Sequence, residues 1–238
     1  MQEDISVVIP TYNEREVIAG TVRSITQETV NLKEIIVVDD NSPDGTGELI
    51  KELSKNDLRI KLISRQDKKG LPGAIAEGIL KAKGKIVLWF DADFASVPGT
   101  ITRMCQDFNS YDILLLSRYV PGGQDGRREK IRVLASKAFN SFANFLLHTK
   151  TKDLTSGYAM ARRDIFDKIT FNGIYGEYFT GFIYKAEKLG FKVKEMPYIC
   201  FSRQKGVSKT SQNLFQFIRY CLIYLNYAFK LKFNIACS

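Results

Sequence analysis

Short apolar runs recur through the first half of the chain and constrain its fold more than any other feature. They occupy residues 7–9, 35–38, 60–63, 86–90 and 113–116. Runs rich in Val, Ile and Leu are typical of strands that are covered on both faces of a parallel sheet. The segments between them, about 14–28, 44–55 and 71–83, have helical patterns. This alternation predicts an α/β fold, a doubly wound and mostly parallel sheet with flanking helices.

Polar motifs follow three of these runs, and the carboxyl ends of strands are where an open α/β sheet binds its ligands. The motifs are Pro10-Thr11-Tyr12-Asn13-Glu14, Asp39-Asp40-Asn41 and Asp91-Ala92-Asp93. A dinucleotide-binding protein would carry a glycine-rich turn after its first strand, and this chain has none there. The motifs therefore predict a different kind of nucleotide site.

Asp91 and Asp93 are the candidate metal ligands. They are two residues apart at the end of an extended segment, so we expect both side chains to project from one face. Carboxylate oxygens are ligands that Mg²⁺ and Mn²⁺ prefer, and such an ion could neutralise a departing diphosphate. Surface aspartates also commonly solvate turns, so the pair alone is weak evidence.

Five motifs in order carry a specific resemblance. They are Val8 to Glu14, Val37 to Thr46, Asp91-Ala92-Asp93, Ser117 to Gly123, and Asp153-Leu154-Thr155-Ser156-Gly157. Over about residues 5–210 the chain resembles the dolichol-phosphate mannose synthase branch of the family 2 glycosyltransferases. The resemblance implies a GT-A fold, an inverting transfer, and Asp91 and Asp93 as ligands of Mg²⁺ or Mn²⁺. It implies a nucleotide-sugar pocket built from Pro10, Tyr12, Glu14, Val38, Asp40, Asp91, Ala92 and Asp93.

The resemblance also assigns basic residues to two phosphates. Arg203 and Lys209 would neutralise the donor phosphates on a loop that closes over the donor. Residues that would hold the phosphate of a lipid acceptor are Arg118, Arg132 and Ser136, and Asp93 and Arg118 would be catalytic. A lipid monophosphate is largely dianionic near neutral pH, so it needs no general base. His148, the single histidine, is expected at the surface.

Two departures leave the sugar and the acceptor open. Relatives commonly have a metal-binding glutamine near the position of Ala95, whereas this chain has Phe94-Ala95-Ser96, and alanine cannot coordinate a metal. The segment 177–181 fits the family only loosely.

The net charge of +9 favours anionic partners such as phospholipid head groups and nucleotides. Nucleic acid is not expected, because no recognition motif accompanies the charge. A basic amphipathic helix at about 131–147 and an aromatic-rich stretch at 214–233 could each lie in a membrane interface or pack on the sheet. We expect a catalytic domain over 1–210, a C-terminal amphipathic membrane-interface segment over 211–238, and no membrane span.

The sequence thus predicts an enzyme at the cytoplasmic membrane face that moves mannose from GDP-mannose to dolichyl or polyprenyl phosphate. It would be peripheral, and an integral-membrane protein could anchor it. Two alternatives within enzymes are UDP-glucose as donor, and a hydroxyl acceptor with Asp153 as the base. An alternative of another class is a membrane-peripheral nucleotide-binding protein without turnover.

Overall fold

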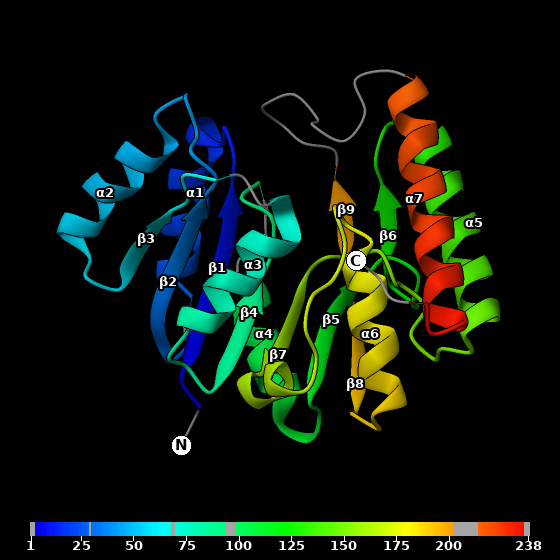
Figure 1. Cartoon of the computed structure of the whole chain (residues 1–238). Helices are drawn as coiled ribbons and strands as arrows, with labels where there is room; N and C mark the ends of the chain where they lie inside the picture. Colours follow the sequence, from blue (N-terminus) through cyan, green and yellow to red (C-terminus); the bar gives the residue numbers. More distant parts are fainter. Residues whose placement is uncertain (1–2, 29, 68–69, 94–98, 202–213, 236–238) are drawn as a thin grey trace.

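The computed structural model describes residues 3–28, 30–67, 70–93, 99–201 and 214–235. A seven-stranded sheet forms its centre, in the order β3-β2-β1-β4-β7-β5-β8 (Figure 1). Its strands are β1 (Ile5–Thr11), β2 (Leu32–Asp39), β3 (Ile60–Ser64), β4 (Ile86–Trp89), β5 (Ile113–Ser117), β7 (Ala159–Arg162) and β8 (Val193–Pro197). Two short strands, β6 (Gln124–Gly126) and β9 (Ile199–Phe201), pair in parallel as a second sheet.

The large sheet is parallel except for β7, which is antiparallel to both of its neighbours, β4 and β5. Ala159 of β7 pairs with Trp89 of β4 and with Leu115 of β5, so β7 joins the two parallel parts of the sheet. Because β4 and β5 both run against β7, they run parallel to each other. The carboxyl ends of β1, β2, β4 and β5 therefore lie at one edge, which the polar motifs follow.

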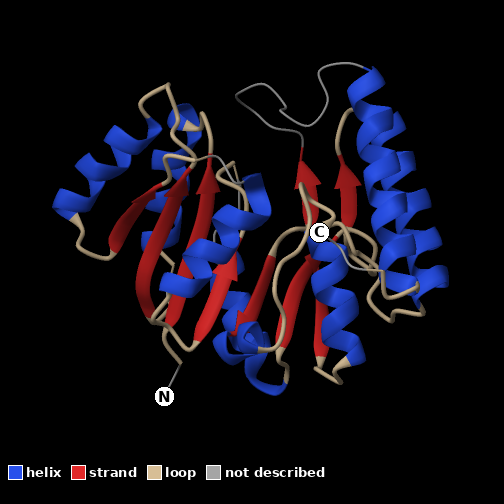
Figure 2. Ribbon diagram, in the orientation of Figure 1, coloured by secondary structure: helices blue, strands red, loops and turns tan. Residues whose placement is uncertain are grey.

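Helices cover both faces of the sheet (Figure 2). The α-helices are α1 (Arg15–Thr26), α2 (Thr46–Asn56), α3 (Gly70–Lys81), α4 (Thr100–Asp107), α5 (Lys130–Leu147), α6 (Tyr178–Lys188) and α7 (Leu214–Lys232), and two short 3₁₀ helices span Phe108–Ser110 and Arg163–Asp167. Helices α1, α2 and α4 bury apolar side chains against one face, and α3 and α6 against the other. Trp89, fully buried, contacts Phe182 and Phe171 with ring centroids 5.4 and 5.7 Å apart.

Helix α7 packs against α5 and α6, and two glycines allow its close approach to the latter. A Cβ atom on Gly181 would lie 2.3 Å from the Tyr227 hydroxyl, and one on Gly176 would lie 2.3 Å from the Tyr224 hydroxyl. On the other side of α7, Tyr224 contacts Phe139 of α5 with ring centroids 5.1 Å apart. The three helices run in the same direction, so their C-terminal ends lie together (Figure 1).

Large apolar side chains lie exposed along the outer faces of α5 and α7. On α5 these are Ile131, Leu134 and Phe145, and on α7 Phe215, Ile218, Leu222 and Phe229, followed by Phe233. Their spacings of 3, 4, 7 and 11 residues are each close to a whole number of helical turns, so each helix has one apolar stripe toward solvent. Among the residues that the structure describes, no helix has the length and apolar character required to cross a bilayer.

The predicted fold class is confirmed, as are the five strands and the helices of the βαβ series. The later elements α4, α6, β7 and β8 were not predicted. Helices α5 and α7 pack mainly on each other rather than on the sheet and leave apolar stripes exposed, and their placement in a membrane interface stays a prediction. The predicted domain boundary at 210 and 211 lies outside the described residues and stays a prediction.

Candidate active site

The loops that follow β1 and β2 are hydrogen-bonded to each other at the carboxyl edge of the sheet. The amide of Asn13 donates to Ser42 Oγ at 2.9 Å, and the amide of Glu14 donates to Thr46 Oγ1 at 3.0 Å. Asn13 and Asn41 both have a φ of 54°, a left-handed conformation that asparagine tolerates better than most residues. The first two predicted motifs thus form one structural unit.

The two aspartates after β2 differ in role. Asp39 accepts hydrogen bonds from Thr11 Oγ1 at 2.9 Å and from the amide of Ser42 at 2.9 Å, so it holds the loops together. Asp40, the predicted nucleotide ligand, is 7% exposed, and its Oδ1 lies 3.0 Å from Arg65 Nη1. Glu77 Oε2 is 3.5 Å from Arg65 Nε.

Arg65 is a candidate site residue that sequence reasoning missed. It follows β3 directly, is 5% exposed, and its Nε and Nη2 have no hydrogen-bond acceptor among the described residues. Unsatisfied buried donors are costly, so such groups commonly await a ligand or water. The signal was available, because a charged residue after a strand at the carboxyl edge belongs to the same ligand-binding region.

The other predicted pocket residues lie at this edge but differ in exposure. Tyr12 and Glu14 are half-buried in the loop after β1. Pro10 is buried in β1, beyond the last pair between β1 and β4, so its missing amide hydrogen costs no ladder bond on that side. Val38 is fully buried, and its side chain packs in the core beside α3, so only its backbone could face a ligand.

The candidate metal carboxylates are placed differently from the prediction. We expected Asp91 and Asp93 on an extended segment, but β4 ends at Trp89, and Ala92 and Asp93 lie in a turn. The Ala92 carbonyl anchors this turn by accepting a hydrogen bond from Thr21 Oγ1 of α1 at 2.6 Å. A carbonyl anchored to a helix fixes the carboxylates at the sheet edge without a strand.

Both carboxylates lie within electrostatic range of Tyr158. Burial is the main reason that the pKa of Tyr158 is raised well above the ordinary tyrosine value. Charge interactions with Asp91, Tyr198 and Asp93 raise it further, in that order. Two hard oxygen donors with room for diphosphate oxygens and water fit Mg²⁺ or Mn²⁺. Within the described ranges, no group of three metal-binding side chains occurs. Ala95 and Ser96 lie outside those ranges.

A second cluster of charges follows β5, around Arg118. Its guanidinium donates to Asp153 twice, from Nε to Oδ2 at 2.8 Å and from Nη2 to Oδ1 at 2.7 Å. Its Nη2 also donates to Thr155 Oγ1 at 2.7 Å, and its Nη1 lies 3.5 Å from Asp125 Oδ2. Although burial favours the neutral form, hydrogen bonds to Asp153 raise the pKa of Arg118 well above its ordinary value.

This geometry limits what Arg118 and Asp153 can do. Most donors of Arg118 are already used, so only Nη1 has capacity for a further anion. Asp153 is 0% exposed and also accepts the backbone amide of Arg118 at 3.0 Å. A carboxylate enclosed in this way is poorly placed to take a proton from a hydroxyl acceptor, which argues against that alternative.

Arg127 is the second residue that sequence reasoning did not select. It pairs with Asp125 through Nε and Nη2 at 2.8 and 2.6 Å. Burial alone would raise the pKa of Asp125, but these bonds and the two arginine charges lower it below the ordinary aspartate value. Arg127 directly follows β6, and only the structure places it beside Arg118.

An amphipathic cavity of about 440 Å³ joins these residues to α5 and α7. At one end lie Arg118, Arg127 and Arg132 with the hydroxyls of Ser136 and Thr155. Tyr119 donates to Ser136 Oγ at 2.8 Å and so helps to fix that hydroxyl. The remaining wall is aromatic and aliphatic, formed by Phe139, Phe142, Phe217, Tyr220, Tyr224 and Leu225. The structure thus brings together all three predicted acceptor residues.

Two tyrosines in edge-to-face contact lie between the Asp91–Asp93 pair and the arginine cluster. Tyr158 and Tyr198 have ring centroids 5.7 Å apart at an interplanar angle of 83°. The pKa of Tyr158 responds to Asp91 and Asp93, and that of Tyr198, raised mainly by burial and Cys200, also responds to Arg118 and Asp153. The carboxylate pair and the arginine cluster are therefore neighbouring parts of one region.

Two other predictions concern loops. Arg203 and Lys209 lie outside the described residues. His148 follows α5, is exposed, and lies at the end of that helix remote from Arg132, as expected for a surface residue.

Comparison with known proteins agrees with this geometry. The model of Glycosyl transferase family 2 matches residues 6–170. Polyprenol monophosphomannose synthase of Mycolicibacterium smegmatis is 35% identical over 216 residues, which are 86% of this chain and 80% of that protein. Dolichol-phosphate mannosyltransferase of Pyrococcus furiosus is 33% identical over 221 residues, 91% of this chain and 62% of that protein. The chain thus spans less than two thirds of the latter relative.

A solved structure with the same fold is glucosyl-3-phosphoglycerate synthase from Mycobacterium tuberculosis, in complex with Mn²⁺, UDP and glucosyl-3-phosphoglycerate. Its TM-score is 0.73 at 17% identity, with 99% of this chain and 82% of that chain covered. The fold and the paired carboxylates at its carboxyl edge define a GT-A glycosyltransferase, and the chain belongs to glycosyl transferase family 2. Within this family it resembles the dolichol- and polyprenol-phosphate mannose synthases, which confirms the resemblance inferred from its motifs.

Proposed function

We propose that this enzyme transfers mannose, with inversion, from GDP-mannose to the phosphate of dolichol or another polyprenol. The observation that carries the proposal is the cavity between α5 and α7, with arginines at one end and an apolar wall over the rest. Arginine binds phosphate through several parallel hydrogen bonds, and an isoprenoid chain requires apolar surroundings. A phosphorylated lipid combines both needs in one molecule.

The donor would bind at the carboxyl edge beside Asp40, Arg65 and the Asp91–Asp93 turn. The buried donors of Arg65 favour a base that offers carbonyl or ring-nitrogen acceptors, and guanine offers both. Asp91 and Asp93 would hold Mg²⁺ or Mn²⁺, which when bound neutralises the charge that develops on the leaving diphosphate. Arg203 and Lys209 are proposed to assist there.

The acceptor phosphate would bind to Arg127, Arg132 and Nη1 of Arg118, which already lies 3.5 Å from Asp125 Oδ2, with Ser136 as a neutral donor. Asp125 and Asp153 pair with Arg118 and Arg127, and Arg132 adds a third positive charge to the cavity that would attract the phosphate. Because that phosphate is already an anionic nucleophile, the attack on the anomeric carbon needs no base. The enclosed Asp153 then has a positioning role.

We further propose that α5 and α7 lie on the cytoplasmic face of a membrane, as a peripheral attachment. Their outward apolar stripes support this, since Phe145 and Phe215 are each 80% exposed. A lipid acceptor could then enter the cavity between the helices from the bilayer. An integral-membrane anchor protein remains compatible with such an arrangement.

The test is transfer of radiolabelled sugar from GDP-mannose and UDP-glucose, in parallel, to dolichyl phosphate in detergent with Mn²⁺. Lipid-linked mannose is expected from the wild type, and Asp93→Asn should lower turnover by about 10²-fold or more. Arg127→Gln should raise the KM for the acceptor about tenfold, while Arg163→Gln, an exposed arginine outside the cavity, should behave as wild type.

Other outcomes would redirect the assignment. Lipid-linked product from UDP-glucose alone would show that UDP-glucose, and not GDP-mannose, is the donor. No lipid-linked product from either donor, with nucleotide binding intact, would exclude the lipid-phosphate acceptor and favour a hydroxyl acceptor or a binding protein without turnover.

A further inference from the structure

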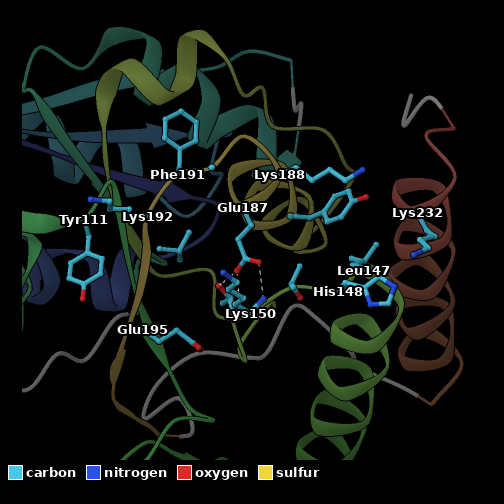
Figure 3. A pocket seen from close by; sticks show the side chains of 15 residues that line it. Tyr111, Leu147, His148, Lys150, Glu187, Lys188, Phe191, Lys192, Glu195 and Lys232 are labelled. Carbon is cyan, nitrogen blue, oxygen red and sulfur yellow. Dashed lines mark hydrogen bonds between the residues drawn. The ribbon is translucent and has the colours of Figure 1, made fainter.

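A second cavity lies at the opposite edge of the sheet from the candidate active site (Figure 3). Its volume is about 770 Å³, and Tyr111, Lys192 and Val193, where β5 and β8 begin, line one side. The C-terminal ends of α5, α6 and α7 complete it, with Leu147, Lys188 and Lys232. Because β5 and β8 begin here, none of the candidate site residues belongs to this cavity.

Lysines dominate this end of the molecule. Four line the cavity, namely Lys150, Lys188, Lys192 and Lys232. An adjoining cavity of about 370 Å³ shares Lys188 and Tyr184 with the first and adds Lys168, Lys185 and Lys230. We call these seven residues the lysine cluster.

In the described part of the chain, the acidic side chains of the cavity bond to backbone amides and form no ion pairs with the lysine cluster. Glu187 accepts the backbone amides of Lys150 and Thr151 at 2.8 and 2.9 Å, and Glu195 accepts those of Lys152 and Asp153 at 2.8 and 3.0 Å. Both glutamates therefore fix the backbone of the loop 149–153, as the dashed lines at Glu187 show (Figure 3). Within the described ranges, no lysine of the cluster has an ion pair with a carboxylate.

A purely structural explanation accounts for part of the charge. Three parallel helices end here, and each C-terminus carries about half a negative charge that nearby lysines stabilise. Lys185 and Lys188 lie in the last turn of α6, and Lys230 and Lys232 in that of α7. The three helix ends carry about 1.5 negative charges together, and Glu187 and Glu195 add two more. The seven lysines therefore exceed the negative charge about twofold. A surplus of positive charge remains for a ligand.

The apolar side chains beside the lysine cluster indicate what that ligand is. Phe145 in the last turn of α5 is 80% exposed, and Phe233, which follows α7, is 65% exposed. Leu189, directly after Lys188, is 56% exposed. A site for a soluble anion needs no exposed apolar rim, whereas lysines with neighbouring apolar side chains suit a bilayer surface.

We propose that the lysine cluster binds the phosphate head groups of anionic phospholipids and so holds α5 and α7 flat on the bilayer. From Arg132 to His148 the axis of α5 rises roughly 24 Å at 1.5 Å per residue, so the lysine cluster and the acceptor cavity lie at opposite ends of one membrane-facing layer. This inference rests on the proposed function only for the membrane location, not for the reaction.

The test uses the full chain and vesicles of phosphatidylcholine with and without phosphatidylglycerol, with binding measured by flotation. The variant carries Lys150→Gln, Lys192→Gln and Lys232→Gln. The matched control removes the same charge elsewhere, with Lys51→Gln, Lys55→Gln and Lys81→Gln on α2 and α3. At about fivefold per lysine, the variant should lose roughly a hundredfold in affinity for phosphatidylglycerol vesicles, and the control far less.

Several outcomes would overturn the proposal. An equal loss of vesicle affinity in both triple variants would show that binding depends only on net charge. Equal binding of the wild type to the two vesicle types would exclude a role for anionic lipid. If inorganic phosphate binds the wild type and not the triple variant without vesicles, as measured by calorimetry, the cluster is a soluble-anion site instead.

Transfer to dolichyl phosphate in detergent, where no bilayer exists, separates this inference from the proposed function. The lysine variant should keep wild-type transfer in detergent, which also shows that it folds. If no variant shows transfer and vesicle binding still depends on the lysines, the proposed reaction fails while this inference stands.

Discussion

Replacing Asp153 by asparagine tests whether the buried Arg118–Asp153 pair fixes the acceptor region. Asparagine keeps the shape but replaces one carboxylate oxygen with a donor. Both oxygens accept from the Arg118 guanidinium, at 2.8 and 2.7 Å, so either orientation of the amide sets a donor against a donor. Arg118, which is 7% exposed, would then keep a single carboxylate partner among the described residues, namely Asp125, whose Oδ2 lies 3.5 Å from Nη1.

Breaking a buried ion pair by removing one partner costs about 3–5 kcal/mol. Because Asp125 remains nearby, we expect the lower end, about 3 kcal/mol of unfolding free energy. The assay is urea denaturation followed by the fluorescence of Trp89, the single tryptophan, which is fully buried. An unchanged m value would show that the folded and unfolded states stay comparable.

Asp164→Asn is the matched control, since this exposed aspartate lies outside the Arg118–Asp153 pair and should change stability by less than about 0.5 kcal/mol. A loss below about 1 kcal/mol for Asp153→Asn would refute the reasoning, because the pair would then be replaceable. Adding Arg118→Met should recover part of the lost stability, because the second substitution removes the unpaired buried charge.

Three further predictions concern stability and reactivity. Burial alone would raise the pKa of Glu34, but hydrogen bonds, that from Lys61 first, lower it below the ordinary 4.5. Its contribution is thus present above that pH and lost as the pH falls through the lowered pKa, so the difference in melting temperature between wild type and Glu34→Gln should shrink in acid. A Cβ on Gly84 would lie 2.6 to 2.9 Å from backbone atoms, so Gly84→Ala should cost about 1–3 kcal/mol in urea denaturation, whereas Gly20→Ala, in open helical space, should stabilise by about 0.5–1 kcal/mol. Burial, with the charge of a nearby glutamate, raises the pKa of Cys105 to about 12, so iodoacetamide should label it far more slowly in the native than in the unfolded protein, as measured by peptide mass spectrometry.

The parallel part of the fold could be predicted from sequence because each strand there is a local apolar run. β7 could not, since Ala159–Arg162 is a four-residue segment with two alanines and one arginine, and only pairing with β4 and β5 makes it a strand. Tertiary context decides such a segment, and no local period reveals it.

The site divides in the same way. Asp91, Asp93 and Asp40 follow strands, so their shared edge could be predicted. The partnership of Arg118 with Asp153 joins residues 35 positions apart, and no spacing rule predicts it. That partnership is also why Arg118 offers less to an acceptor than its motif suggests, and why Arg127 gains importance.

The antiparallel strand β7 has a consequence for how the chain folds. β5 has neighbours only in β7 and β8, both of which come later in the sequence, and β7 also completes the free side of β4. Until residues 159–162 arrive, a growing chain therefore exposes one unpaired edge of β4 and both edges of β5. Such edges promote aggregation. Fragments that end before β7 should be insoluble, whereas the β1-to-β4 unit, built from local crossovers, forms early.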